Sequence, residues 1–363
     1  MILIFVLPLR HERCSGARAI GIIVPRTRLI ALLLLVPSLA AAAARVASTG
    51  GFVKRGRPVF RGQYGIAGDP DVVRSGATYR MCYTCPDPEH GRAAICLATS
   101  RNGVVWRPTS GFRDTRARGL VLRGDDGSWD ENTETCALVA GDERVLYYAG
   151  YPDGSSQALG SEIGVAHATG DGTFVAEMNS VLERTPGWYD NDAIYSPTIL
   201  HEADGWSMVY AGHCYTDCPG ATGVFLLGAT SVDGRVWTKL DAPLLGPDPA
   251  ITWMIDGAAE PALLEAGDGT YYLFFTGLEG FARVIGIARG PTPFGPWTLD
   301  PNPVIVPTAD YERAGVLAPS VLLEGGVLRV WYLATKWQRA TQSLHHAIGY
   351  ATASASVVFA GVP

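Results

Sequence analysis

The sequence is short of positive charge and of helical patterning. Its 363 residues include 29 lysines and arginines against 35 acidic residues, for a net charge of −6 and a pI near 5.7. The basic residues form no stripe, which argues against a nucleic-acid partner. After residue 50 no amphipathic helical pattern of useful length occurs, whereas 43 glycines and 24 prolines fit many turns. These absences favour an all-β chain.

Long apolar runs are also scarce, and the main candidate, residues 29–44, is interrupted by Pro37. It falls short of the roughly twenty residues that a membrane span needs, although an anchor is the alternative interpretation. A basic residue, Arg26, precedes it and small residues end it, which is the plan of a secretory signal peptide. We therefore predict a leader over residues 1–45, with the true start downstream of Met1. The mature protein is expected to be secreted or periplasmic, with no stable membrane insertion.

Seven cysteines are present, and the six that follow the predicted leader favour disulfides in an exported chain. Cys214 and Cys218 could close a loop, and Cys85 and Cys96 could staple a hairpin. The spacing of Cys82 and Cys85 could instead serve metal or redox chemistry. No second pair of this kind and no nearby histidine pair supports a zinc site. The connectivity stays open at this point.

One pattern repeats five times along the rest of the chain. A short stretch is followed 14 or 15 residues later by an aromatic residue in a β-rich run. The stretches open 65, 62, 64 and 58 residues apart, at Asp69, Glu134, Ser196, Glu260 and Ala318. Their aromatic residues are Tyr83, Tyr148, Tyr210, Phe275 and Tyr332. A period of about 60 residues built from short strands is typical of a β-propeller, in which each repeat is one four-stranded blade.

The same pattern places the strands of each repeat. We expect the innermost strand to begin at the variable residue and the second strand to contain the repeated aromatic. A turn and a tryptophan then lead into an outer segment, which the last repeat lacks. Residues 51–61 match the outer segment of the fourth repeat, residues 297–305. We therefore predict one domain over residues 46–363, a single five-bladed β-propeller whose ring is closed by an N-terminal strand completing the last blade.

The first residue of each innermost strand should point toward the propeller axis at one rim. Asp69, Glu134 and Glu260 would then converge on one central pocket. Carboxylates that lie so close together cannot all ionise without a large cost in free energy, so their pKa values are driven apart. One can then act as a base while another keeps its proton, which is the pair that glycoside hydrolysis requires. The alternative is that each is a solvated or turn-capping group.

Other polar and aromatic residues lie near these positions. Asp130, Asp192 and Asp256 each precede a variable residue by four, and a residue repeated in this way suits the bonding of backbone N–H groups. Asp192 is the exception, because the third repeat offers only Ser196 in the variable position. Aromatic side chains could stack on sugars or could simply pack, namely Trp129, Trp188, Tyr189 and Trp253.

Two of the variable residues open motifs that are typical of a known enzyme group. Gly68-Asp69-Pro70 resembles the His-Asp-Pro stretch that opens blade one in glycoside hydrolase family 43, with glycine for histidine. Glu260-Pro261 is similar to the Glu-Gly-Pro stretch that opens blade four, without the middle glycine, and Phe294-Gly-Pro-Trp297 is also typical. The chain thus resembles the five-bladed glycosidases of family 43 and its relatives in families 32, 62, 68 and 117, over residues 51–353. The resemblance implies a general base at Asp69 and a general acid at Glu260.

The sequence departs from the family pattern in two blades. The blade-three aspartate that tunes the acid's pKa falls on Ser196, and blade two opens with Thr133-Glu134-Thr135 instead of tryptophan-alanine-proline. We expect Glu134 to take over the tuning role, or Asp192 to reach in. The Asn-Asp-Pro-Asn-Gly signature of family 32 is absent, which weakens a retaining, fructosidase-like interpretation.

The resemblance implies hydrolysis of a pentose- or furanoside-containing oligo- or polysaccharide, as by an arabinofuranosidase, arabinanase or xylosidase, with inversion. Two-carboxylate hydrolysis requires no cofactor and no metal. A structural calcium or other ion at the propeller axis is a further possibility, for which the candidate ligands are His213, His345 and His346.

Two other functions compete with this interpretation. A non-catalytic carbohydrate-binding propeller is motivated by the missing blade-three aspartate, and it predicts that Glu260→Gln leaves function intact. A glycoside phosphorylase would need a basic cluster at the same rim to hold phosphate. Arg80, Arg92 and Arg283 exist, but nothing in the sequence groups them. Because propellers host many activities, the fold alone does not decide between them.

Overall fold

The computed structural model describes residues 50–363 apart from positions 64, 114, 204, 340 and 341. The predicted leader, residues 1–45, lies outside the described residues. Regular structure in the described part is almost all β-strand, so the all-β prediction is confirmed. It also contains two 3-10 turns, η1 (Thr252–Met254) and η2 (Asp310–Glu312), and a short C-terminal helix, α2 (Ala355–Gly361). None of the described helices is long and apolar enough to cross a membrane.

The described strands form four sheets, within which five antiparallel groups can be distinguished because a single parallel pair, Val224 with Gly257, joins two groups into one eight-stranded sheet. The first holds β2 (Gly68–Ser75), β3 (Thr78–Asp87), β4 (Arg92–Ser100), β5 (Arg107–Pro108) and β6 (Leu120–Leu122). The second holds β7 (Asn132–Val139), β8 (Asp142–Tyr151), β9 (Glu162–Ala168) and β10 (Phe174–Ala176). The third holds β11 (Ala193–Glu202), β12 (Gly205–Cys214), β13 (Gly223–Ser231) and β14 (Thr238–Lys239). The fourth holds β15 (Gly257–Glu265), β16 (Tyr271–Glu279), β17 (Ala282–Gly290) and β18 (Thr298–Leu299). The fifth holds β19 (Gly315–Glu324), β20 (Val327–Gln338), β21 (Ser343–Ser354) and β1 (Val53–Lys54).

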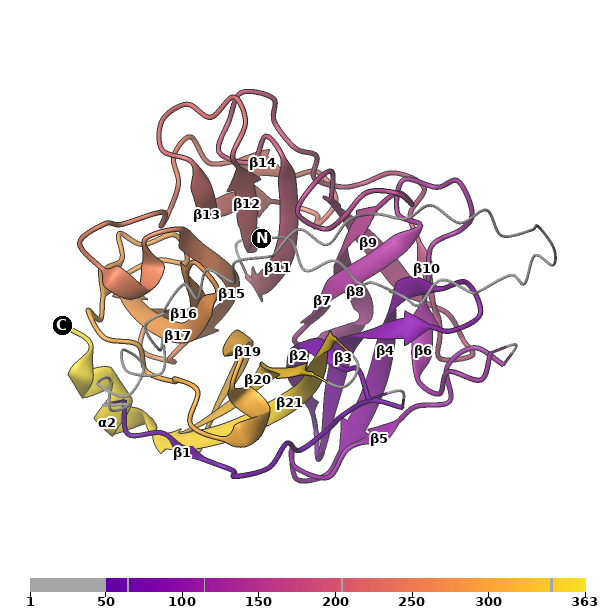
Figure 1. Cartoon of the computed structure of the whole chain (residues 1–363), viewed down its shortest axis with the longest axis horizontal. Helices are drawn as coiled ribbons and strands as arrows, with labels where there is room; N and C mark the ends of the chain where they lie inside the picture. Colours follow the sequence, from indigo (N-terminus) through magenta and orange to yellow (C-terminus); the bar gives the residue numbers. More distant parts are fainter. Residues whose placement is uncertain (1–49, 64, 114, 204, 340–341) are drawn as a thin grey trace, which may run out of the picture.

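The first strand of each group lies toward the middle of the molecule (Figure 1). These strands contact one another in the cyclic order β2, β7, β11, β15 and β19, with β19 again against β2. The N-terminal strand belongs to the sheet of the last group, because Val53 of β1 pairs with Thr352 of β21. The chain therefore brings its earliest and latest described strands into one sheet.

Aromatic side chains fill the space between neighbouring groups. The repeated aromatics are at most 1% exposed, namely Tyr83, Tyr148, Tyr210, Phe275 and Tyr332. Apolar clusters join residues of adjacent groups, as where Phe274 and Tyr332 share one cluster with Val358 of α2. Large buried rings contribute much of the packing energy of such a core. The repeated aromatic of the sequence is therefore scaffold.

Three disulfides are present among the described residues. Cys85–Cys96 bridges β3 and β4, and Cys214–Cys218 closes a loop after β12, so both pairs considered from the sequence are confirmed. Cys82 pairs with Cys136 of β7 and links the first two groups. The spacing of Cys82 and Cys85 thus reflects two separate disulfides and not a metal or redox pair.

Candidate active site

In every group the first strand carries one non-glycine residue in the left-handed backbone region. The φ angles lie between 46° and 52°, at Asp69, Thr135, Ser196, Glu260 and Ala318. A β-bulge interrupts the strand pairing at each of these positions. Such a conformation costs on the order of 1–3 kcal/mol and is concentrated at functional sites. Five copies at one structural position therefore mark a place where the fold turns side chains toward a common site.

The structure corrects the alignment of the second repeat by one residue. Thr135, and not Glu134, has the left-handed conformation. The spacing from the repeated aromatic predicted the wrong residue because the β7–β8 hairpin is one residue shorter than the β11–β12 hairpin. Tyr148 follows Thr135 by 13 residues, whereas Tyr210 follows Ser196 by 14. The innermost strands also begin one to three residues before these positions and not at them.

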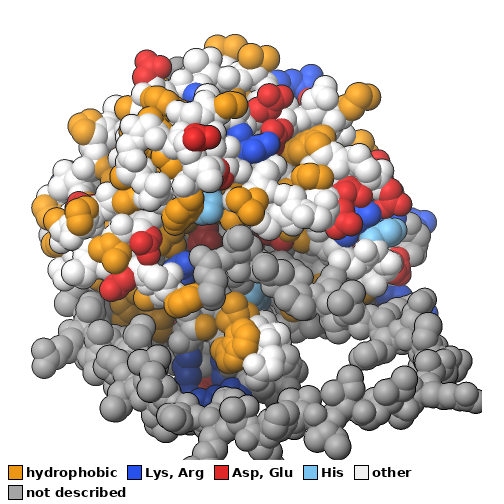
Figure 2. Space-filling model, turned by 45° about the horizontal axis from the view of Figure 1, so that its top comes forward, with side chains coloured by type: hydrophobic (Ala, Val, Ile, Leu, Met, Phe, Trp, Pro, Cys, Tyr) orange, Lys and Arg blue, Asp and Glu red, His pale blue; other side chains and the backbone are white. Residues whose placement is uncertain are grey.

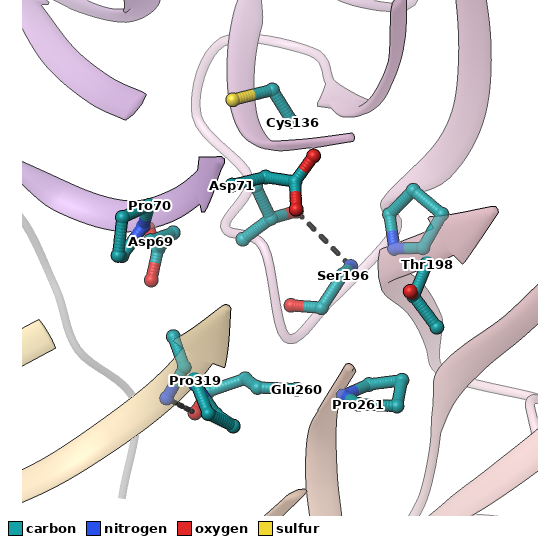
Figure 3. Close-up of a pocket in the computed structure, with 12 residues that line it drawn as sticks. Asp69, Pro70, Asp71, Cys136, Ser196, Thr198, Glu260, Pro261 and Pro319 are labelled. Atoms are coloured by element: carbon teal, nitrogen blue, oxygen red, sulfur yellow. Dashed lines mark hydrogen bonds between the residues drawn. The ribbon is translucent and has the colours of Figure 1, made fainter. Parts of the chain in front are cut away.

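A narrow pocket opens between the five bulges (Figure 3). In the close-up the side chains of Asp69, Ser196 and Glu260 project toward a common space from β2, β11 and β15. The hydroxyl of Ser196 is buried and has no hydrogen-bond partner among the described residues. The lining residues are Asp69, Pro70, Asp71, Thr135, Cys136, Ser196, Pro197, Thr198, Glu260, Pro261, Ala318 and Pro319.

Asp69 and Glu260 line this pocket, as does Asp71, and Glu134, which does not line it, acts on Asp69 through its charge. Asp69 and Glu260 keep partial access to solvent, whereas Glu134 is buried. Burial, reinforced by the charges of Glu260 and Glu134, raises the pKa of Asp69 to about 8. Burial also raises the pKa of Glu134 to about 7, although the phenol of Tyr151 donates a 2.7 Å hydrogen bond to its Oε1. The fold therefore assembles acidic groups that hold protons near neutral pH.

Glu260 is held by two donors at one oxygen. The hydroxyl of Thr276 lies 2.6 Å from its Oε2, and the backbone N–H of Ala318 donates to the same oxygen at 2.9 Å. Burial raises the pKa of Glu260, while these two hydrogen bonds and the charge of Arg283 oppose the rise. No hydrogen bond to Oε1 occurs within the described residues, so this oxygen is left to the pocket.

Asp192 makes its contacts with a rim loop and not with the three carboxylates. It accepts the N–H groups of Tyr215 at 2.5 Å and Thr216 at 3.1 Å. Asp256 accepts the N–H of Gly280 at 2.6 Å in the corresponding loop of the next group. Each aspartate therefore anchors the loop that follows the second strand of its own group, as the structural alternative predicted.

The second group has the same anchor one residue later than the sequence spacing predicted. Glu131, not Asp130, accepts the N–H of the loop residue Asp153, at 2.7 Å. Asp130 is buried and accepts the phenol of Tyr148 at 2.5 Å. This difference follows from the one-residue shift at Thr135.

The four aromatic residues considered for sugar stacking do not line the pocket. Trp129 and Trp253 stack on the repeated aromatics of their own groups, with ring centroids 6.1 Å and 5.8 Å apart. Trp188 and Tyr189 contact each other at 5.0 Å and stay partly exposed. The first two residues therefore pack the scaffold, and sugar stacking stays a prediction for the second two.

A set of residues beside Glu260 was not predicted from the sequence. The ring of His213 lies 6.4 Å from that of Tyr195 and 4.6 Å from that of Tyr215, which is 50% exposed. The charge of Arg283 acts on Glu260 and on both tyrosines. We call Tyr195, His213, Tyr215 and Arg283 the rim cluster. None of these four residues lines the pocket, and the cluster holds hydroxyl, imidazole and guanidinium groups of the third and fourth groups.

Solved structures share this fold, although no protein-family profile and no curated protein matches the sequence. One described as a glycoside hydrolase is 19% identical, with a TM-score of 0.61 over 85% of this chain and 92% of that chain. A thermostable family-43 glycoside hydrolase is 17% identical, with a TM-score of 0.58 over 78% and 88%. A β-1,2-mannobiose phosphorylase from Listeria innocua, bound to β-1,2-mannobiose, is 10% identical, with a TM-score of 0.64 over 86% and 99%.

The chain has the fold of these β-propeller glycosidases. The resemblance inferred from the two motifs is therefore confirmed at the level of fold.

Figure 2 shows acidic and basic side chains interspersed on one face of the molecule.

The histidines considered for an axial ion are not gathered into one site. A ring nitrogen of His213 bonds to the carbonyl of Ala158 at 2.9 Å. His346 lies against Gly68, and burial, with the neighbouring His345, lowers its pKa to about 4. Within the part of the chain that the structure describes, no group of three or more His, Cys, Asp or Glu is placed to hold a metal. These three histidines are therefore not grouped as ligands of one ion, and an ion at the propeller axis stays a prediction.

Proposed function

We propose that this chain is a glycoside hydrolase acting on a pentose- or furanoside-containing glycan. The observation that carries the proposal is the placement of Asp69 and Glu260 at equivalent bulges of the first and fourth groups, facing one pocket. Both residues belong to the motifs that resemble family 43. Glycoside hydrolases also recur among solved structures with the same fold.

We interpret the five groups as the blades of one propeller domain over residues 46–363, closed by β1. The cyclic contacts of the first strands and the pairing of β1 with β21 support this interpretation. Lys54 of β1 also forms a 2.6 Å ion pair with the buried Glu312 of η2. A closed ring removes free sheet edges, which protects the chain against edge-to-edge association.

In the proposed reaction Asp69 takes a proton from a water whose oxygen attacks the anomeric carbon. The bond to the leaving oxygen breaks, and Glu260 gives that oxygen a proton from Oε1. The products are two free sugar hydroxyl groups, and the resemblance to family 43 is the ground for expecting inversion. Glu134, held by Tyr151, tunes the pKa of Asp69 through its charge, which leaves Asp192 with its loop-anchoring role.

The substrate would contact the pocket through groups that the fold leaves available. Ser196 offers its unpartnered hydroxyl between the two carboxylates. The rim cluster lies beside Glu260 and presents the half-exposed ring of Tyr215. Sugars are bound through such hydroxyl contacts and aromatic faces. The scheme uses no cofactor and no metal.

We also propose that the protein is secreted or periplasmic. Three disulfides within the described residues suit an oxidising compartment. The predicted leader, whose residues lie outside the described part, is the sequence feature that supports export. Amino-terminal sequencing of the protein recovered from its native compartment tests for removal of residues 1–45.

The decisive experiment is sugar release by the purified protein from arabinans, arabinoxylan, arabinogalactan and fructans. Glu260→Gln should lower the rate by several orders of magnitude, whereas the exposed Glu183→Gln should match the wild type. The anomer first released, followed by NMR, reports inversion or retention. If no sugar is released from any of these substrates, or if the wild type and Glu260→Gln release it at the same rate, the carbohydrate-binding propeller is favoured.

A glycoside phosphorylase is the second candidate, because a mannobiose phosphorylase shares the fold. Of the three arginines considered for phosphate, Arg283 acts on Glu260, whereas Arg92 pairs with Asp126 and Glu131. One arginine at the rim is a weak anion site, so hydrolysis is favoured. Repeating the panel with inorganic phosphate and assaying sugar phosphate separates the two reactions.

A further inference from the structure

Two threonines outside the reaction scheme contact the two proposed catalytic carboxylates. Thr276 of β16 donates a hydrogen bond to Glu260 at 2.6 Å, and Thr84 of β3 lies opposite Gly68, the residue before Asp69, and close enough to lower the pKa of Asp69. The two threonines are equivalent in the strand register, because each lies opposite the residue that precedes its carboxylate. A threonine therefore occupies the same register position beside the carboxylate in the first and fourth groups.

Each threonine hydroxyl also receives a backbone N–H from the following group. The N–H of Thr135 lies 3.0 Å from the hydroxyl of Thr84, and that of Ala318 lies 2.9 Å from the hydroxyl of Thr276. A hydroxyl has one proton to donate and can accept as well. Accepting the N–H leaves that proton directed at the carboxylate, so the orientation of the hydroxyl is fixed.

The other three groups have neither an ionisable bulge residue nor this hydroxyl. The corresponding residues on β8, β12 and β20 are Ala149, Ala211 and Leu333. Their bulge residues are Thr135, Ser196 and Ala318. Between the second and third groups the bulge residue Thr135 itself accepts the N–H of Ser196, at 3.1 Å, so a bond between groups does not require a threonine beside a carboxylate.

We propose, resting on the function proposed above, that Thr84 and Thr276 are positioning residues that orient the two carboxylates and keep the proton of Glu260 on Oε1. Oε2 of Glu260 accepts from both Thr276 and the N–H of Ala318, so it is the oxygen without the proton. A donor to a carboxylate favours its ionised form. Each hydroxyl therefore opposes the effect of burial on its own carboxylate.

Several other ionisable groups act on these two carboxylates and stay in place when the threonines are changed. The carboxylates repel each other. The further titratable or charged groups around them are Asp71 of the first group, Glu134 and Tyr151 of the second, Tyr195 of the third and Arg283 of the fourth, and His346 of the fifth lies against Gly68. In a threonine variant, a pKa change that is confined to one carboxylate therefore reports the loss of that hydroxyl.

The test is a carboxyl-carbon NMR titration of the full protein, with Asp69 and Glu260 assigned through Asp69→Asn and Glu260→Gln. Thr276→Val should raise the pKa of Glu260 by about 1, because a hydrogen bond to a charged group is lost. Thr84→Val should raise that of Asp69 in the same way, while Thr276→Ser and Thr84→Ser keep both values. In pH–rate profiles each valine variant should shift one limb to higher pH.

A matched control is Thr198→Val, because the hydroxyl of Thr198 accepts the N–H of Leu263 between groups at 3.2 Å and bonds no carboxylate. It should leave both pKa values unchanged. The proposal is overturned if neither valine variant moves its carboxylate, or if Thr198→Val moves them equally. Alanine at Thr84 or Thr276 replaces valine where valine prevents folding. Because this readout needs no turnover, it is separate from the loss of activity in Glu260→Gln that tests hydrolysis.

Discussion

The backbone N–H of Tyr215 donates to the carboxylate of Asp192 across 2.5 Å, and this bond fixes the loop that carries a half-exposed aromatic ring. The disulfide Cys214–Cys218 closes the same loop. Little conformational entropy remains for the ring to lose when a ligand arrives. The Asp192 carboxylate, which sequence spacing left open as a tuning group, thus acts through the loop that it holds.

Tyr215→Ala should raise KM about tenfold, a loss of about 1.4 kcal/mol, with a smaller effect on kcat. The ring supplies binding area and does not take part in proton transfer. Steady-state kinetics on the substrate found in the panel measures the effect. Tyr215→Phe keeps the ring and should retain the wild-type KM, and equal KM values for the alanine variant and the wild type would exclude stacking there.

Asp69→Asn should stabilise the protein at pH 8 and not at pH 4. The folded pKa of Asp69 is raised to about 8, so the folded state binds its proton more tightly than the unfolded chain does. That contribution to stability is present at acidic pH and is lost as the pH rises toward about 8. Thermal unfolding at the two pH values measures the difference. Asp171, whose pKa is lowered to about 2 by hydrogen bonds from Thr169 and Thr173, serves as control, and Asp171→Asn should not raise Tm at pH 8.

Glu134→Gln should shift the limb of the pH–rate profile that reports Asp69 to lower pH. The charge of Glu134 contributes to the raised pKa of Asp69, and glutamine keeps the size of the side chain. The wild-type kcat/KM is expected to rise as the pH approaches about 8, because the proposed base must first lose its proton. An unchanged profile would show that Glu134 does not tune the base.

Lys54→Met should cost about 3 kcal/mol of unfolding free energy, since it leaves the buried carboxylate of Glu312 without its cation. Equilibrium urea unfolding measures this cost. Arg235→Met breaks a more exposed ion pair with Glu177 and should cost less than about 1 kcal/mol. Similar costs for the two variants would contradict a special role for Lys54.

The sequence predicted the all-β fold because a period-two strand pattern and a buried aromatic recur at nearly constant spacing. It misplaced the second bulge because spacing from the aromatic counts hairpin length as well as bulge position. Thr135-Cys136-Ala137-Leu138 already resembles Glu260-Pro-Ala-Leu, and this comparison would have found the correct residue.

Other parts of the site depend on strand pairing, which sequence spacing does not specify. The residue after each repeated aromatic runs Thr84, Ala149, Ala211, Thr276 and Leu333, so a signal for the positioning threonines was present. Its meaning requires knowing that the residue lies beside the carboxylate across the sheet. The rim cluster combines residues from the third and fourth groups and had no such signal, and the Cys82–Cys136 bond depended on contact between two groups.

The pairing of β1 with β21 also affects how the chain is made. Val53 and Thr352 are separated by about 300 residues, so the strand that is synthesised first has no partner until synthesis is almost finished. Closing so long a loop is an entropically costly late step. Until β21 has been made, β1 has no partner strand, and its unpaired edge is exposed to pairing with other chains. Agents that hold an unfinished chain apart from its neighbours should therefore increase the yield of this protein more than agents that stabilise the completed fold.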